Sequence, residues 1–196
     1  MTGKNIYMCG VGGQGIGVLA EVLIQGCLRA GHKVKGVDTH GLAQRGGIVI
    51  SHLRLGNNAH TPRIMPGQAD LVVGLERLEA YRAICHMMKM GGTAVYYDVE
   101  YQPIAVRMGQ SDYPTTEQLA EACQERQGRH ERVVLEDLPD PRMQNVAVLG
   151  RLAGLEVIEG LNAENLSASL TDVLPRYVLE ENLAVFDRAM HISAAS

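Results

Sequence analysis

Apolar and polar positions along the chain alternate between two rhythms, one typical of strands and one of helices. A short apolar run at residues 6–9 precedes a glycine-rich segment, after which Ile16, Leu19 and Leu23 recur at helical spacing in a stretch that ends at Ala30. Further strand-like runs occupy residues 34–38, 48–55, 71–75, 93–97 and 133–135, and helix-like stretches occupy residues 78–90 and 115–128. This alternation predicts an α/β fold with a largely parallel sheet flanked by helices.

The last third of the chain is predicted to be helical, over residues 146–152, 162–170 and 175–190. Helix boundaries carry their own signals. Thr115 and Gln118 have the spacing of a capping box, Gly31 stands where a helix-ending glycine belongs, and the helix over residues 78–90 is expected to stop at the following two glycines. Because neither an internal repeat nor a low-complexity segment interrupts the pattern, residues 1–196 are predicted to form a single domain.

A glycine-rich segment, Gly10-Val-Gly-Gly-Gln-Gly15, lies between the first predicted strand and the first predicted helix. A strand, a glycine turn and a helix in this order are typical of a Rossmann-like unit. The glycines permit a tight turn and close approach of a ligand to the backbone, and the free N–H groups of the helix start attract an anion. The residues predicted to bind a phosphate-bearing ligand or a partner's cofactor here are Gly10, Gly12, Gly13, Gln14 and Gly15.

A second polar segment, residues 40–47, follows the next predicted strand. Loops that follow parallel strands emerge at the same edge of a sheet, so we expect the two segments to face each other. Amide donors, a fixed cation and exposed backbone N–H groups suit a pyrophosphate or a carboxylate. The residues assigned to this half of the site are His40, Gln44, Arg45, Gly46 and Gly47. The alternative is a structural turn in which Arg45 is a solvated surface charge.

Other interpretations of the same residues stay open. Asp38 ends the second predicted strand, where a dinucleotide-binding fold places the acid that binds the ribose, so a self-sufficient NAD-binding oxidoreductase is one alternative. No catalytic pair can be located for it, and a nucleotide-free Rossmann-like interaction module is another alternative. Asp98 and Glu100, at the end of a later strand, are expected to be solvated loop carboxylates.

Composition narrows the class of protein. The formal net charge is −4, which argues against nucleic acid as a partner because such proteins present a basic face. No apolar run approaches the ~20 residues of a membrane span, and no basic-then-apolar signal region opens the chain. We therefore expect a cytoplasmic protein that binds neither nucleic acid nor a membrane.

The four cysteines, Cys9, Cys27, Cys85 and Cys123, are spread along the chain. None has the CxxC spacing of a zinc or iron–sulfur site, and each falls inside a predicted strand or helix. We predict four buried, reduced thiols and no metal site or cluster in this chain.

The motifs taken together resemble a known family. The glycine turn, the segment His40-Gly-Leu-Ala-Gln-Arg-Gly-Gly47 and the run Ser51-His-Leu-Arg54 are similar to the gamma-type component of 2-oxoacid:ferredoxin oxidoreductases. The similarity is closest to the beta subunit of the indolepyruvate ferredoxin oxidoreductase branch and continues along most of the chain. Leu42 stands where that branch commonly has Met, and residues 99–131 show no motif that can be matched.

The resemblance implies a subunit rather than a complete enzyme. In such complexes a 2-oxoacid is decarboxylated on thiamine diphosphate, the acyl unit passes to coenzyme A, and iron–sulfur clusters carry electrons to ferredoxin. The thiamine and the clusters belong to other domains or to a larger partner subunit. The resemblance therefore implies that this chain binds none of these cofactors alone, is inactive alone, and contributes a site at the interface with that partner.

Overall fold

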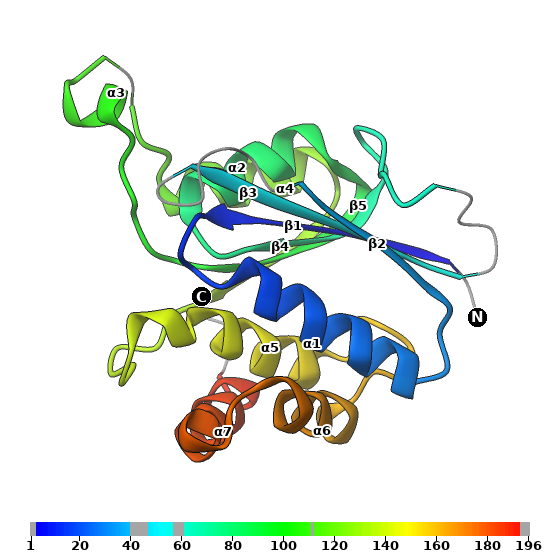
Figure 1. Cartoon of the computed structure of the whole chain (residues 1–196). Coiled ribbons are helices and arrows are strands. Elements are labelled where there is room, and N and C mark those ends of the chain that lie inside the picture. The colour runs from blue at the N-terminus through cyan, green and yellow to red at the C-terminus, as the bar shows by residue number, and fades with distance from the viewer. Residues whose placement is uncertain (1–2, 40–46, 57–60, 111, 193–196) are drawn as a thin grey trace.

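Six strands form one sheet in the order β2-β3-β1-β4-β5-β6 (Figure 1). The computed structural model describes residues 3–39, 47–56, 61–110 and 112–192. The strands are β1 (Lys4–Val11), β2 (Val34–Thr39), β3 (Ile48–Leu55), β4 (Ala69–Gly74), β5 (Met88–Tyr97) and β6 (Arg129–Val133). The pairs β1–β4, β4–β5 and β5–β6 are parallel, whereas β3 runs antiparallel to both β1 and β2. The predicted α/β fold with a largely parallel sheet is confirmed.

The antiparallel direction of β3 follows from the length of the connection that precedes it. Only residues 40–47 separate β2 from β3, whereas a crossover between parallel strands needs about a dozen residues or more. The two strands therefore pair as a hairpin, with Val34 opposite Leu55 and Thr39 opposite Ile50. Because β1 and β2 are both antiparallel to β3, they point in the same direction and their carboxyl ends reach the same edge of the sheet.

Helices cover the two faces of the sheet unequally. On one face α1 (Ile16–Arg29) and α5 (Gln144–Leu155) lie against the strands, and α6 (Ala163–Val173) and α7 (Arg176–Met190) pack beneath them (Figure 1). The other face carries α2 (Arg77–His86), which contacts β1, β4 and β5, and α4 (Thr116–Glu125), which contacts α2 and β6. The one-turn helix α3 (Ile104–Arg107) stands away from the sheet on an arm (Figure 1).

Each face has its own hydrophobic core. The core under α1 and α5 includes Leu23, Leu149 and Phe186, and the smaller core under α2 includes Ile84 and Tyr96. Most of the larger core comes from apolar residues of α1 and the three C-terminal helices at helical spacing, which is the pattern that predicted those helices. None of the described helices is long and apolar enough to cross a membrane.

Some predicted boundaries are wrong. The helix predicted over residues 78–90 ends at His86, and Met88 already pairs with Ala69 as part of β5. The backbone after His86 pairs with the start of β4 instead of continuing the helix, since the N–H of Ala69 donates to the carbonyl of Met87 at 2.8 Å. Strand β6 lies earlier than the predicted residues 133–135, and α3 was not predicted.

The capping box that starts α4 is confirmed. The hydroxyl of Thr115 accepts a hydrogen bond from the N–H of Gln118 at 3.3 Å, and the Gln118 side chain accepts one from the N–H of Thr115 at 2.9 Å. These reciprocal bonds satisfy two backbone donors that a helix start leaves without partners. The three C-terminal helices lie within a few residues of their predicted bounds.

Candidate functional site

The glycine turn lies at the edge of the sheet where β1 ends. Gly10 and Val11 still belong to β1, and the turn itself spans residues 12–15 before α1 begins at Ile16. Gly13 and Gly15 have φ angles of 106° and 79°, a left-handed conformation that side chains other than glycine rarely adopt. A Cβ atom at Gly13 would meet nothing within 4 Å, so the space above this peptide is open to a ligand.

Gly10 and Gly15 have packing reasons to be glycine. A Cβ at Gly10 would lie 3.1 Å from the Cβ of Leu75, and a Cβ at Gly15 would lie 2.5 Å from Nδ2 of Asn145. That Nδ2 donates to the carbonyl of Gly15 at 3.2 Å. The first glycine therefore lets β1 approach the end of β4, and the last lets α5 approach the start of α1.

Gln14 points inward and holds the turn together. Its side chain is only 5% exposed, and its carbonyl oxygen accepts a hydrogen bond from the N–H of Val11 at 2.7 Å. Its Nε2 lies 2.5 Å from the carbonyl of Leu75 and 2.9 Å from Oε1 of Gln144, so both amide hydrogens have partners. Among the residues predicted for ligand binding, Gln14 is thus placed to shape the turn from inside, and its side chain is not available to a ligand at the surface.

The second predicted segment, residues 40–47, contacts the glycine turn through Gly47, the one residue of the segment that the structure describes. The carbonyl of Gly47 accepts a hydrogen bond from the N–H of Gly12 at 2.8 Å. His40, Gln44, Arg45 and Gly46 lie outside the described residues. The end of this segment and the glycine turn therefore meet at one edge of the sheet, as expected for loops that follow β1 and β2.

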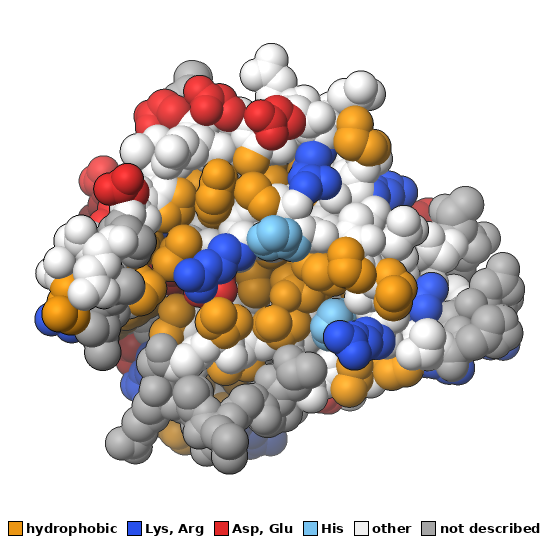
Figure 2. Space-filling model, turned by 90° about the horizontal axis from the view of Figure 1, so that it is seen from above, with side chains coloured by type: hydrophobic (Ala, Val, Ile, Leu, Met, Phe, Trp, Pro, Cys, Tyr) orange, Lys and Arg blue, Asp and Glu red, His pale blue; other side chains and the backbone are white. Residues whose placement is uncertain are grey.

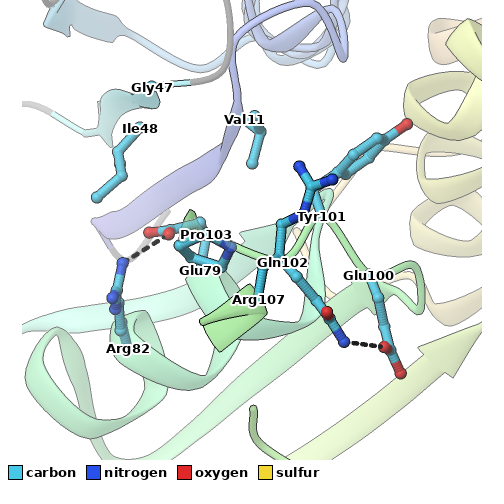
Figure 3. A pocket seen from close by; sticks show the side chains of 10 residues that line it. All are labelled: Val11, Gly47, Ile48, Glu79, Arg82, Glu100, Tyr101, Gln102, Pro103 and Arg107. Carbon is cyan, nitrogen blue, oxygen red and sulfur yellow. Dashed lines mark hydrogen bonds and ion pairs between the residues drawn. The ribbon is translucent and has the colours of Figure 1, made fainter. Parts of the chain in front are cut away.

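A cavity of about 650 Å³ opens beside this edge (Figure 3). Val11 and Gly47 lie on one side of it, and α2 contributes Glu79 and Arg82 (Figure 3). Ile48 of β3 also lines the cavity, and the arm that carries α3 supplies Glu100, Tyr101, Gln102, Pro103 and Arg107. Two smaller hollows, of about 300 and 270 Å³, adjoin the glycine turn itself and share Gly13 and Arg142.

The charges around the cavity are partly neutralised. Arg82 pairs with Glu79 at 2.8 Å, and Arg142 pairs with Asp140 at 2.5 Å. Arg107 forms no ion pair with any residue in the described part of the chain. A guanidinium without a carboxylate partner beside open backbone suits an anionic group, such as a phosphate or a carboxylate.

Two buried carboxyl groups lie at the start of α2. Glu76 caps the helix, accepting a hydrogen bond from the N–H of Glu79 at 2.9 Å, and it also accepts one from the N–H of Tyr101 at 3.3 Å. Burial raises the pKa of both glutamates above the ordinary value, against the opposing effect of the backbone donors at Glu76 and of Arg82 at Glu79. Glu76 therefore anchors the arm beside the cavity to α2.

The prediction that Asp98 is a solvated loop carboxylate is wrong. Its side chain is 2% exposed and accepts charged hydrogen bonds from Arg77 and Arg132, both at 2.5 Å. Arg77 also pairs with Glu100, which is 44% exposed and closer to the expected solvated carboxylate. The sequence did not identify Glu79, Arg82 or the arm as parts of the site, although the first two follow the end of β4 at the same edge as the glycine turn.

The alternative role of Asp38 meets a geometric obstacle. Asp38 lies on β2 opposite Ser51 of β3, and Ser51 lies opposite Met8 of β1, so a whole strand separates Asp38 from the strand that carries the glycine turn. The hydroxyl of Ser51 also donates a hydrogen bond to the Asp38 carboxylate. In a dinucleotide-binding fold the acid ends the strand next to β1, and here β3 occupies that place.

The cysteines lie apart from this edge, except for Cys9 of β1. Cys9, Cys27 and Cys123 are buried as predicted, whereas the prediction is wrong for Cys85, which is half-buried. Burial raises the pKa of the Cys27 and Cys123 thiols to about 12. Within residues 3–39, 47–56, 61–110 and 112–192 no three His, Cys, Asp or Glu side chains are grouped so that they could hold a metal ion.

A mostly parallel sheet flanked by helices, with a glycine turn between its first strand and first helix, is typical of a Rossmann-like α/β domain. The chain belongs to the pyruvate ferredoxin/flavodoxin oxidoreductase family, which matches residues 5–192, and it is a gamma-type subunit of a 2-oxoacid:ferredoxin oxidoreductase complex. The resemblance stated from the sequence motifs is thereby confirmed.

Relatives support this membership over the full length. The chain is 31% identical to the indolepyruvate oxidoreductase subunit IorB of Pyrococcus horikoshii over 193 residues, which cover 95% of this chain and 94% of the relative. IorB of Methanothermobacter thermautotrophicus is 31% identical, with 98% of each chain covered. IorB of Thermococcus kodakarensis is 37% identical over a shorter match of 125 residues, 64% of this chain and 61% of that protein.

Solved structures show the same fold. The gamma subunit of a keto/oxoacid ferredoxin oxidoreductase from Geobacter sulfurreducens PCA superposes with a TM-score of 0.66 at 16% identity, covering 95% of this chain and 96% of that one. A 2-oxoglutarate:ferredoxin oxidoreductase from Magnetococcus marinus superposes with a TM-score of 0.68 at 20% identity. That match covers all of this chain and 32% of the longer one.

Proposed function

We propose that this chain is the gamma-type subunit of an oxidoreductase that decarboxylates indolepyruvate or a related aromatic 2-oxoacid to its acyl-CoA. The observation that carries the substrate class is the similarity to IorB subunits over nearly the whole chain. Thiamine diphosphate and the iron–sulfur clusters are held by a larger partner subunit, and ferredoxin receives the electrons. The chain is one folding domain, and it acts in the cytoplasm as part of this complex.

The role of this chain is to complete a site at the interface. The open peptide at Gly13, the unpaired Arg107 and the neighbouring cavity of about 650 Å³ support binding of an anionic group presented by the partner, such as a phosphate or a carboxylate. Gly12, Gly15 and Gly47 keep the backbone close to that group, and Gln14 fixes the turn. His40, Gln44, Arg45 and Gly46 are proposed to line the same site.

Reconstitution with the thiamine-dependent subunit tests this proposal. The chain alone is expected to contain no iron and to turn over no 2-oxoacid with a dye acceptor, and addition of the partner is expected to give indolepyruvate-dependent dye reduction. Stoichiometric iron–sulfur absorbance in the isolated chain, or a complex that oxidises no 2-oxoacid, would refute it. Calorimetric titration with NAD separates the alternative, since no binding tighter than about 1 mM is expected.

Variants of two arginines test the interfacial site. Arg45→Ala and Arg107→Ala each remove a cation that is proposed to contact the anionic group through a charge-assisted bond of roughly 1.5–3 kcal/mol. Activity of the reconstituted complex is therefore expected to fall by about tenfold to a hundredfold. Arg129→Ala, at an exposed position on β6, is the control and should leave activity unchanged. Unchanged activity in both test variants, with unchanged melting, would remove the anion site from the proposal.

A further inference from the structure

A groove of about 780 Å³ lies on the α2 side of the sheet, over β2 and β3, where no helix of the described part of the chain covers the strands. Tyr7 of β1 packs with the core under α2, and its ladder partner His52 on β3 therefore faces the same side, as does Val37 of β2 opposite His52. The segment after β3 closes the groove with Ile64 and Met65. The groove is thus a sheet surface bordered by a loop, beyond the reach of α2 and α4.

Apolar side chains dominate this surface. Figure 2 looks onto this side of the molecule and shows hydrophobic side chains gathered in a band across it. Val37 is 37% exposed, Ile48 is 46% exposed and Met65 is 65% exposed. Ile48 also lines the cavity beside the glycine turn, so the apolar band on β3 leads directly to the candidate site. Contiguous exposed apolar side chains of this kind mark a surface that another protein covers.

Among the described residues, the charged side chains at the border of the groove that lack an ion-pair partner are all basic, since Asp70 in the neighbouring row is paired with Lys89. Lys35 lies two positions from Val37 and opposite Arg54, so these side chains share a face with the groove, and Arg63 lines the groove itself. Arg54 donates to Asn5 and Thr61, whereas Lys35 and Arg63 form no ion pair with any residue that the structure describes.

We propose that this groove docks the thiamine-bearing partner subunit through an apolar segment flanked by acidic side chains, an inference that rests on the proposed function. Charge complementarity selects this occupant. A second copy of the chain, paired through the same patch on both sides, would bring Lys35 and Arg63 against their own equivalents, and like charges in an interface cost several kcal/mol. A heterologous partner with carboxylates at the rim neutralises them.

Binding of the full-length chain to the purified partner subunit tests the docking surface. Arg63→Glu is expected to raise the Kd about tenfold or more at low salt, with the difference shrinking as salt is added. Arg129→Glu is the matched control, because Arg129 is also exposed and without an ion pair in the described part of the chain but lies on β6 at the opposite edge of the sheet. Its Kd should equal that of the wild type.

A second pair of variants tests the apolar contact without changing charge. Met65→Gln is expected to raise the Kd, while Leu28→Gln, at a residue 49% exposed on α1 on the other side of the sheet, should not. Thermal melting of all four variants should match the wild type. Wild-type affinity in both Arg63→Glu and Met65→Gln would overturn the docking surface and leave the proposed function standing.

Two further outcomes are decisive. If the wild-type chain does not bind the thiamine-bearing subunit at all, the proposed function fails and the docking proposal fails with it. If sedimentation shows that the wild-type chain self-associates and that Arg63→Glu abolishes this, the occupant is a second copy and the proposal is overturned.

Discussion

The two faces of the sheet are built differently. The face under α1 and α5 is covered along the sheet, and α6 and α7 add a second layer of helices beneath them (Figure 1). The opposite face is covered by α2 and α4 over β1, β4, β5 and β6, and its remaining part on β3 and β2 forms the floor of an open groove. One face therefore provides most of the core, and the other provides most of the accessible chemistry.

Polar groups follow the same division. Glu76 and Glu79 are buried at the start of α2 on the partly covered face, and Glu79 lines the cavity at the sheet edge. The doubly covered face is filled mainly by aliphatic side chains. We therefore expect the stabilising contacts to be concentrated on one side of the sheet and the proposed recognition on the other, so that substitutions on the two faces have separable effects.

The largest expected difference compares a leucine of the covered face with a methionine of the open groove. Leu23 is completely buried, so Leu23→Ala should lower the free energy of unfolding by about 2–5 kcal/mol because it leaves a cavity. Met65 is 65% exposed, and Met65→Ala should change it by no more than about 0.5 kcal/mol. Chemical denaturation of the isolated chain measures both. Equal losses would mean that the groove is part of the stabilising core.

The periodicity of apolar residues determines how much of this two-sided fold could be predicted from the sequence. Helix-period and strand-period runs predicted both the alternating fold and the helical last third, because apolar spacing directly reflects which side of an element is buried. The direction of β3 and its position between β2 and β1 were not predicted, since hydrophobic spacing carries no information about which strands pair. The same limitation explains why Asp38 looked suitable for a ribose and proved to lie one strand too far away.

The candidate site was predicted only in its local part. The glycines of the turn were recognisable because a left-handed φ at Gly13 and Gly15 requires that residue type. The inward orientation of Gln14 depends on Gln144, which is 130 residues away in the chain, so no local motif could reveal it. Glu79 likewise joins the site only because the α2 start shares a sheet edge with β1.

Two glycines in helices of the covered face, Gly150 in α5 and Gly17 in α1, separate the effect of helix packing from that of helix propensity. A Cβ at Gly150 of α5 would lie 2.2 Å from the backbone carbonyl oxygen of Phe186 in α7, so Gly150→Ala should cost about 1–3 kcal/mol by forcing the helices apart. A Cβ at Gly17 of α1 would meet nothing within 4 Å. Gly17→Ala should therefore stabilise the chain by about 0.5–1 kcal/mol through helix propensity. Thermal unfolding of the two variants should shift in opposite directions, and a tolerated Gly150→Ala would contradict the close α5–α7 packing.

The smallest expected effect concerns the buried carboxyl group of Glu79 on the partly covered face, and it depends on pH. Burial raises the pKa of Glu79, so the folded protein disfavours its ionised form, and this cost appears as pH rises above the ordinary glutamate value of 4.5. Glu79→Gln avoids ionisation and should become more stable relative to the wild type as pH rises between about pH 4 and pH 7.

The exposed Glu117 gives the opposite sign, since hydrogen bonds from the hydroxyls of Thr115 and Thr116 contribute to lowering its pKa. Its ionised form stabilises the fold above pH 4.5 and that contribution disappears as pH falls, so Glu117→Gln should lose stability relative to the wild type as pH rises. Urea unfolding across this range should give slopes of opposite sign for the two variants. A Glu79→Gln variant that gains no stability relative to the wild type as pH rises would contradict the raised pKa of Glu79.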